Sequence, residues 1–499
     1  MHSQDSLLLR SVCLVLIAAG CGVSWRAQAA CAAQNTCFGI NALQSITTGD
    51  QNSAFGYEAL FGNTDGSSNS AFGAFALRNN TGGRGNTAVG VAALRSNTIG
   101  GGNTAVGNFA LADMPATGIR NTAIGEFAMT AQFGSTAGTD FNTALGAVAL
   151  FNLQNGNNNT AVGYNAMQGP PESGIVSAVG NTAVGARAME STSGGEANTA
   201  VGYGALLAIS QESPDPYSFN TAVGGGAIQL IWNGEYNTAI GYHAMLGDQP
   251  GITGDWNTAN GANALMVNTS GVGNTATGYN SLHSNSTGIR NTGNGINSLG
   301  KVTTGARNTA LGAGAGSNIT TGSDNVIIGA QNSGIAAENG VIRIGNGAYQ
   351  KKAFVAGIRG VTTGLANATT VFIDGNGQLG TKKSSREYKE DIHPIDSLSD
   401  RLGSLRPVAF RYKQAYDDGS KPVEYGLIAE EVAEVFPELV VYNQDGRPET
   451  VRYDLLSTLL VNEFQKEQAV VGSQAATISS LQTRLTELEA RLEYLENSR

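Results

Sequence analysis

NTAVGVAALRSNTIGGG, residues 86–102, is one copy of a 17-residue unit that recurs over most of this chain. The next copy begins at Asn103 with the same five letters. Most neighbouring copies start 17 residues apart, and five longer intervals contain insertions of one to five residues, as surface loops tolerate. The seventeen copies begin at Asn35, Asn52, Asn69, Asn86, Asn103, Asn121, Asn142, Asn159, Asn181, Asn198, Asn220, Asn237, Asn257, Asn274, Asn291, Asn308 and Asn325.

Each unit follows the pattern N-T-A-φ-G-x-x-A-L, where φ is usually apolar, and ends in a polar stretch rich in Asn, Thr and Gly. Gly and Asn in every unit disfavour a helix, because each internal Gly costs about 1 kcal/mol. Short strands joined by Gly/Asn turns suit the pattern better. We therefore predict a mainly β protein in which residues 30–345 form a parallel β-solenoid, with one unit per coil. At about 4.8 Å between paired strands, seventeen coils make a rod about 80 Å long.

Equivalent side chains of successive coils are expected to form rows along the solenoid. We expect the φ row (the fourth position) and the Leu row (the ninth) to supply the apolar core, and the Asn rows to form amide ladders. Because coils this thin bury little apolar area, we expect the rods to associate through their apolar rows as trimers. The repeats resemble the heads of trimeric autotransporter adhesins, which are left-handed parallel β-rolls and usually have a shorter period.

The φ position becomes polar in three successive units, at Asn260, Thr277 and Asn294. One interpretation is drift in a locally looser coil, and the other is a polar layer inside the rod or trimer that holds water or an ion. Calcium-binding β-rolls need a recurring Asp beside Gly-Gly, which these repeats lack. Only four histidines occur, and none has the spacing of a zinc ligand pair. We therefore expect no metal and no cofactor.

Residues 1–29 have the features of an export signal. Arg10 precedes the apolar run SVCLVLIAAGCGV, and AQA at 27–29 provides small residues for cleavage. The run is too short to span a bilayer and no later stretch is long enough, so we expect an exported protein, at the cell surface or outside the cell, without a transmembrane span after signal removal. The alternative is a lipoprotein signal in which Cys21 is acylated.

The net charge indicates which partners to expect, and the cysteines bear on whether the chain forms a disulfide. The formal net charge of −10 argues against a nucleic-acid partner, because binding phosphates needs a basic face. Cys31 and Cys37 remain after removal of the signal. They either form a disulfide in an oxidising compartment or are free thiols.

The composition changes at Ser384, because the last 116 residues carry 34 charged side chains, as many as the preceding 383 residues. We expect a β connector over 346–383, where TTVFIDGNGQLGT predicts a hairpin, and a small α+β domain over 384–465. Residues 466–499 are expected to form a coiled coil. Its apolar seam has alternating spacings of three and four, at Ile478, Leu481, Leu485, Leu488, Leu492 and Leu495.

Four blocks between 384 and about 480 resemble the C-terminal intramolecular chaperone of phage endosialidases and tail spikes, a self-cleaving serine peptidase family: SSREYKEDI, LRPVAFRYK, YGLIAEEVAEVFPELV and VRYDLLSTLLV. Members trimerise, assist folding of the preceding fibre and cut themselves off before a serine. The resemblance implies a homotrimer that is cleaved between Lys383 and Ser384, with Ser384 as nucleophile and Lys389 as its partner. Many members carry Asp directly after the serine, where this chain has Ser385, so Ser384 and Ser385 both stay candidates.

The residue types suit such chemistry. A serine hydroxyl is a poor nucleophile until a base takes its proton, and a lysine serves as that base where burial lowers its pKa. Ser384 would attack the carbonyl carbon of Lys383, and backbone N–H groups would stabilise the oxyanion. The enzyme would be an endopeptidase that acts once, on its own chain. The structural alternative is that Ser384 caps a helix, with Glu387 completing a capping box and Lys389 in solvent.

Two further functions stay open. The C-terminal domain is a permanent trimerisation clamp on a structural adhesin if no cleavage occurs. The solenoid is a stalk that binds a host or surface glycan if its loop insertions carry a binding site.

Overall fold

The computed structural model describes residues 34–498, apart from 114–115, 132–138, 171–173, 176, 193, 208–217, 249–250 and 444. The expected export signal, with Cys21, and the expected disulfide partner Cys31 lie outside the described residues. The chain divides into two compact units after Val355. No helix among the described residues is long and apolar enough to cross a membrane.

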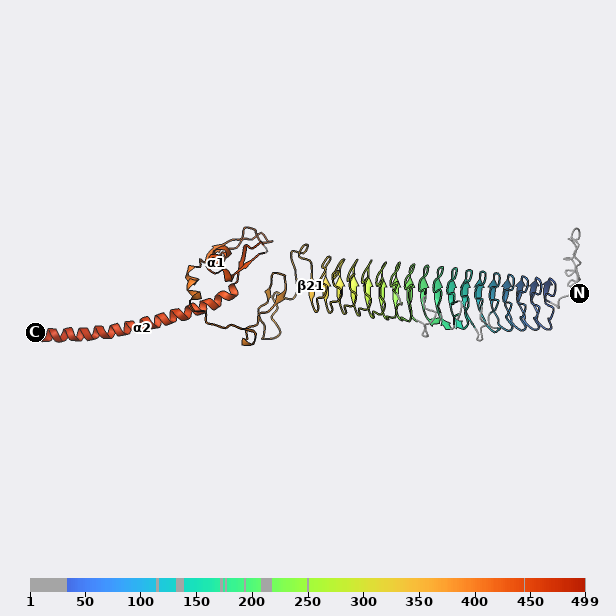
Figure 1. Ribbon diagram of the computed structural model, residues 1–499, viewed down its shortest axis with the longest axis horizontal. Coiled ribbons are helices and arrows are strands. Elements are labelled where there is room, and N and C mark those ends of the chain that lie inside the picture. Colours follow the sequence, from blue (N-terminus) through green and yellow to red (C-terminus); the bar gives the residue numbers. More distant parts are fainter. Residues whose placement is uncertain are drawn as a thin grey trace, which may run out of the picture. The chain divides into compact units, whose positions relative to one another are not determined.

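The first unit is a parallel β-solenoid, as the repeats predict (Figure 1). Eighteen strands form one sheet, and each pairs in parallel with the strand of the next coil. Residues in equivalent positions of the unit face each other, for example Thr87 with Thr104 and Val89 with Val106. The strands of this main sheet are β1 (Thr36–Phe38), β2 (Ser53–Phe55), β3 (Ser70–Phe72), β4 (Thr87–Val89), β5 (Thr104–Val106), β6 (Thr122–Ile124), β7 (Thr143–Leu145), β9 (Thr160–Val162), β11 (Thr182–Val184), β13 (Thr199–Val201), β14 (Thr221–Val223), β15 (Thr238–Ile240), β16 (Thr258–Asn260), β17 (Thr275–Thr277), β18 (Thr292–Asn294), β19 (Thr309–Leu311), β20 (Val326–Ile328) and β21 (Ile342–Ile344).

A second, three-stranded parallel sheet lies elsewhere on three successive coils. It consists of β8 (Gly156–Asn157), β10 (Ser177–Val179) and β12 (Gly194–Glu196), with β10 in the middle.

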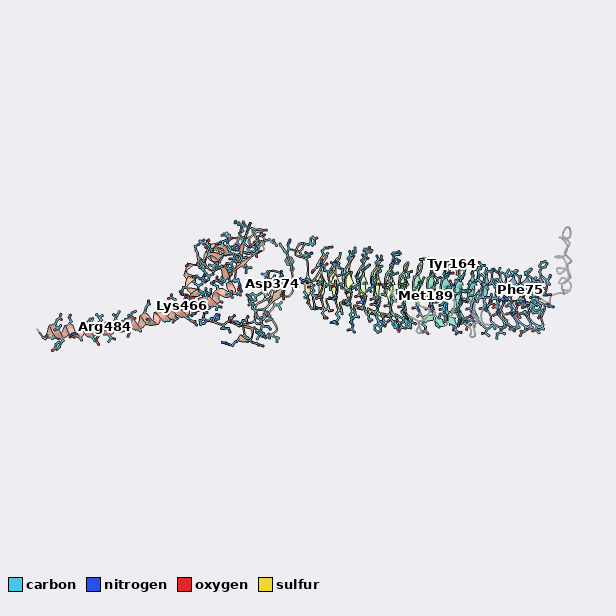
Figure 2. The ribbon with its side chains drawn as sticks, viewed as in Figure 1. Phe75, Tyr164, Met189, Asp374, Lys466 and Arg484 are labelled. Atoms are coloured by element: carbon cyan, nitrogen blue, oxygen red, sulfur yellow. The ribbon has the colours of Figure 1, made fainter. Side chains whose placement is uncertain are left out.

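The φ row lies on the outer face of the main sheet, which corrects the expectation that it supplies the core. Ala88 of β4 is fully buried, whereas Val89 beside it is 38% exposed. Successive residues of a strand point to opposite faces, so a coil that turns the small Ala inward must turn φ outward. The core consists instead of this Ala row together with the later Ala and Leu rows, such as Ala93 and Leu94. Met189 fills the Leu position of its coil and is fully buried, while Tyr164 is exposed (Figure 2).

The three polar φ residues share this outward position. Asn260 and Asn294 are exposed and Thr277 is half-buried, while Ala259 and Ala276 of the same strands fill the interior. A polar layer inside the rod is therefore wrong, because these side chains point away from it. A layer between neighbouring rods stays a prediction.

An amide ladder runs inside the coils along the first Asn of each unit, as predicted. The backbone N and the Nδ2 of Asn86 both donate to Oδ1 of Asn69, at 3.0 and 3.1 Å. Its Nδ2 also donates to the carbonyl of Gly100 at 2.9 Å. Asn103 makes the same two bonds to Asn86, at 3.0 and 3.1 Å. Because these amides are buried, the ladder supplies partners that water cannot.

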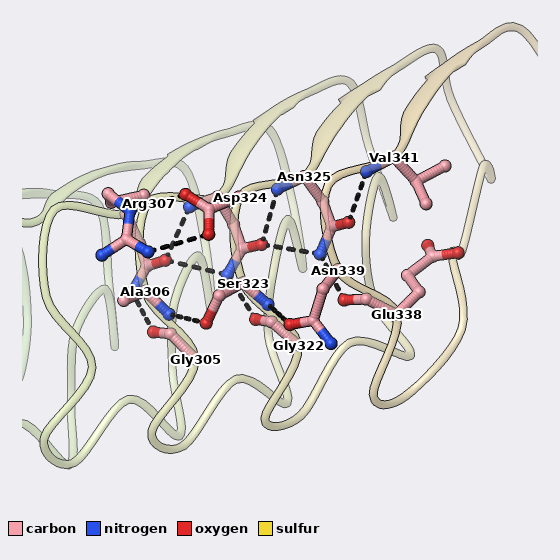
Figure 3. Close-up of polar contacts among 12 residues, drawn as sticks. Gly305, Ala306, Arg307, Gly322, Ser323, Asp324, Asn325, Glu338, Asn339 and Val341 are labelled. Carbon is pink, nitrogen blue, oxygen red and sulfur yellow. Dashed lines mark hydrogen bonds and ion pairs between the residues drawn. The ribbon is translucent and has the colours of Figure 1, made fainter.

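The ladder ends where the repeated sequence ends. The backbone N and Nδ2 of Asn325 donate to Oδ1 of Asn308, at 3.2 and 2.9 Å. The backbone N of Val341 donates to Oδ1 of Asn325 at 3.1 Å (Figure 3). Val341 stands where earlier coils have Asn, so it has no amide side chain to offer a further coil. The next strand, β21, is the last of the main sheet.

The Gly that follows each strand is required by the close approach of two coils. Gly90 has a φ of 132°, and a Cβ added there would lie 2.3 Å from the carbonyl oxygen of Gly107. Leu94, by contrast, adopts a φ of 53° although it is not Gly. That conformation costs about 1–2 kcal/mol, and burial of the side chain in the core offsets it.

The second unit contains the predicted hairpin, strands and helices. Its elements are β22 (Phe372–Ile373), β23 (Leu379–Gly380), η1 (Arg386–Tyr388), η2 (Asp396–Ser404), β24 (Val408–Phe410), β25 (Glu424–Gly426), α1 (Ala429–Val435), η3 (Pro437–Leu439), β26 (Val440–Tyr442), β27 (Pro448–Val451) and α2 (Tyr453–Asn497). Three antiparallel pairs form, β22 with β23, β24 with β25 and β26 with β27. We expected the α+β domain to end at 465 and the coiled coil to begin at 466, and both residues lie within the single continuous helix α2 (Figure 1).

The core of the second unit is small for its length. Its buried apolar residues are Val432, Phe436, Leu439, Val440, Val451 and Leu459. The predicted seam of α2, from Ile478 to Leu495, is 55% to 61% exposed at its six positions. A helix with an uncovered heptad seam is typical of a coiled-coil strand seen without its partners.

Replacing one ladder amide by an apolar side chain is expected to destabilise the solenoid. Asn86→Leu removes the side-chain bonds to Asn69 Oδ1 and the Gly100 carbonyl, and it removes the Oδ1 that accepts from the backbone N and Nδ2 of Asn103. This should lower the free energy of unfolding by roughly 3 kcal/mol. Urea unfolding of the variant measures this. The control is Asn79→Leu at an exposed position, for which we expect a change within about 0.5 kcal/mol. Equal effects of the two substitutions would contradict a stabilising ladder.

Candidate active site at Ser384

The predicted serine and lysine lie in contact. Nζ of Lys389 donates a hydrogen bond to Oγ of Ser384 at 3.0 Å. The single turn of η1 lies between them and returns the chain, with Tyr388 N bonded to Ser385 O at 3.0 Å and Lys389 N bonded to Arg386 O at 3.1 Å. Residues 381–384, which lead into the turn, are exposed and have no regular secondary structure. The bond between Lys383 and Ser384 is therefore accessible.

The two neighbouring serines have different partners. Oγ of Ser385 accepts a hydrogen bond from the backbone N of Glu387 at 3.4 Å, so Ser385 is the N-cap of η1. Ser384 does not take the capping role that the structural alternative gave it. Its hydroxyl faces an amine that accepts a proton once neutral, whereas the hydroxyl of Ser385 is engaged with the turn. Of the two candidate serines, Ser384 is therefore the one bonded to Lys389, and Ser385 is the one that caps η1.

The two residues before Ser384 are also held by side-chain contacts. Nζ of Lys383 lies 4.2 Å from the ring centroid of Tyr388, within range of a cation–π interaction. Nζ of Lys382 donates to Oδ2 of Asp454 at 2.7 Å and lies 4.3 Å from the ring centroid of Phe372. The hydrogen bond from Lys382 lowers the pKa of Asp454 below its ordinary value, although partial burial opposes the shift.

Sequence reasoning missed Asp454 because it lies 72 residues from Lys382. Its only sequence signal is an acidic residue in the first turn of a helix, which is common because it suits the helix dipole. Nothing in that signal points to the predicted cleavage site.

The predicted nucleophile and base are accessible to solvent in the single chain. Ser384 and Lys389 are exposed, and so are the nearby apolar side chains Tyr388 and Ile392. Among the described residues, no group of three or more His, Cys, Asp or Glu is placed to hold a metal ion. At the other end of the chain, Cys37 is disulfide-bonded.

Residues 384–441 match the model of a family described as "Chaperone of endosialidase". The C-terminal unit contains an endosialidase-chaperone domain. Its match begins at Ser384, the residue whose hydroxyl contacts Lys389. This domain follows a long parallel β-solenoid, an arrangement that suggests a protein of the tail-fibre type. No curated protein and no solved structure matches the chain.

Proposed function

We propose that this chain is an exported fibre protein whose endosialidase-chaperone domain assembles three copies and then cuts itself off between Lys383 and Ser384. The contact between Lys389 Nζ and Ser384 Oγ carries this proposal. The family match supports it in two ways, because the matching family is named as a peptidase and the match starts at the proposed new N-terminus.

The proposed chemistry needs no group beyond these side chains and water. Neutral Lys389 takes the proton from Ser384 Oγ, which attacks the carbonyl carbon of Lys383. The C–N bond breaks as the proton passes to the leaving amine of Ser384, and an ester links Lys383 to the serine oxygen. Water then hydrolyses this ester. In the alternative route, water attacks the carbonyl carbon of Lys383 directly and no ester forms. The products are a carboxylate on Lys383 and a free amino group on Ser384.

Assembly supplies what the single chain lacks for this reaction. A lysine in water is protonated at neutral pH and cannot accept a proton, so a lysine base must be shielded from solvent. Lys389 is exposed in the single chain, with Tyr388 and Ile392 exposed nearby. Neighbouring copies that cover this surface make the site active only after assembly. The cut then separates the finished solenoid from its chaperone.

Two uncovered surfaces support association of the chain with itself. One is the seam of α2 from Ile478 to Leu495. The other is the outer face of the main sheet, where none of the main-sheet strands before β21 contains a charged residue. We place this face between the rods of a homotrimer. Asn260, Thr277 and Asn294 then form the polar layer at the interface.

Export by residues 1–29 and pairing of Cys31 with Cys37 belong to the same proposal, and attachment through an acylated Cys21 is the alternative to removal of the whole segment. N-terminal sequencing of the exported protein distinguishes the two signals, and mass analysis under non-reducing conditions tests the disulfide. No observation on the described residues specifically supports a host or surface glycan as a partner.

Substitution of the reacting residues is expected to abolish the cut. The wild-type chain should release a 116-residue fragment that begins at Ser384. Ser384→Ala and Lys389→Met should release none, because they remove the nucleophile and the base. Ser385→Ala should still cleave, since its hydroxyl only caps η1. Intact-mass analysis with N-terminal sequencing of the fragment gives the answer.

The alternatives produce other patterns in the same experiment. An uncut wild-type chain that is trimeric by light scattering makes the domain a permanent clamp. A fragment that begins at Ser385, lost in Ser385→Ala and retained in Ser384→Ala, makes Ser385 the nucleophile.

Cysteine crosslinking tests the proposed face of the solenoid. Val89→Cys places a thiol on the φ row, and Ile99→Cys places one on the polar stretch of the same coil, at a position that is 61% exposed. A short bismaleimide should join chains of the Val89→Cys variant into dimers on a denaturing gel, because each chain offers one thiol, and leave the Ile99→Cys variant mainly monomeric. Equal crosslinking of both variants, or none of either, would refute this placement of the face.

A further inference from the structure

An ion pair links the segment before the cleavage site to the helix that carries the coiled-coil seam. Lys382 contributes Nζ and Asp454 contributes Oδ2, 2.7 Å apart, and the two side chains are 49% and 31% exposed. Lys382 immediately precedes the residue whose carbonyl is attacked, and Asp454 lies in the first turn of α2. The pair therefore connects the segment just before the proposed cleavage site to α2, the helix proposed to assemble the copies.

The start of α2 is fixed in place, which fixes Asp454. Oη of Tyr453 accepts a hydrogen bond from the backbone N of Leu427 at 2.8 Å, just after β25. A Cβ on Gly426 would lie 2.7 Å from that same hydroxyl, so the absence of a side chain at 426 allows the contact. Lys382 is held from its own side as well, by the ring of Phe372 in β22.

A second contact ties α2 to the chaperone domain further along the helix. Nδ2 of Asn462 donates to Oγ of Ser399, and Ser399 donates to Oε2 of Glu463, both at 2.7 Å. Ser399 is fully buried in η2. The helix α2 is thus anchored near both Asp454 and Glu463, and its seam begins beyond them at Ile478.

We propose that Asp454 is a positioning residue for self-cleavage, which holds Lys382 so that the Lys383 carbonyl faces Ser384 Oγ. This inference rests on the proposed cleavage. It adds that the bond is aligned by α2 itself, so that the helix which joins the copies also orients the peptide to be cut. An exposed ion pair contributes modestly, so loss of Asp454 slows the cut and does not abolish it.

The test measures the rate at which the 116-residue fragment appears from full-length protein. Asp454→Asn and Lys382→Met should each slow it about fivefold, which corresponds to ~1 kcal/mol in the barrier. The double exchange Lys382→Asp with Asp454→Lys should recover most of the wild-type rate, because it restores the pair with reversed charges. The matched control is Asp400→Asn, which removes the ion pair of Asp400 with Lys466 of α2 and should cleave at the wild-type rate.

The salt dependence of the cleavage rate distinguishes an ion-pair role of Asp454 from a purely structural one. Higher ionic strength should slow the wild-type cut and leave the Asp454→Asn variant almost unaffected, because exposed ion pairs are screened. Light scattering on each variant shows whether the trimer is retained.

Several results would overturn the proposal. They are a wild-type rate in Asp454→Asn, a double exchange as slow as the single variants, and slow cleavage that accompanies loss of the trimer. A wild-type chain that is never cut removes both the proposed function and this inference. A wild-type chain that is cut, beside an Asp454→Asn variant with an unchanged rate, removes this inference alone.

Discussion

Hydrogen bonding between the buried Asn amides of successive coils is the interaction on which the solenoid depends. Each Asn donates to the coil before it and accepts from the coil after it, so every coil must bring its Asn to the same place. Insertions are tolerated only where they leave that place unchanged. Asn142 follows Asn121 by 21 residues, yet its backbone N donates to Oδ1 of Asn121 at 3.0 Å, as in the regular coils. The ladder bond is therefore the same across this longer interval as across the regular ones.

The same narrow interior decides what the solenoid shows to its surroundings. The interior of each coil contains the Ala and Leu side chains together with the ladder amides. The φ side chain of each strand is larger than the neighbouring Ala and lies outside this interior. Those side chains form an uncharged outer face along the main sheet. In such a chain the interior is packed by the side chains of each coil and its neighbours. The φ row stays on the surface, where other chains can contact it.

The C-terminal unit has the complementary character, with a small core, many charges and a long helix whose seam is exposed. Its contacts around Ser384 converge on three consecutive residues. Lys382 contacts α2, Lys383 contacts η1 and Ser384 contacts the lysine that follows η1. One short segment thus joins the proposed chemistry to the helix proposed to assemble the copies.

The sequence by itself determined the solenoid, the amide ladder, the connector hairpin and the seam of α2. Each of these depends on a period or a short spacing, which backbone geometry converts directly into position. The pairing of Ser384 with Lys389 came from the family resemblance, because the spacing alone also fits a helix cap. Only the tertiary structure decided that the φ row points outward, because alternation along a strand allows either face to be inside until the coil closes around Ala. It also decided which serine caps η1, since adjacent hydroxyls differ only in direction. Asp454 could not be found from the sequence, because a contact across 72 residues depends on how α2 packs and leaves no local pattern.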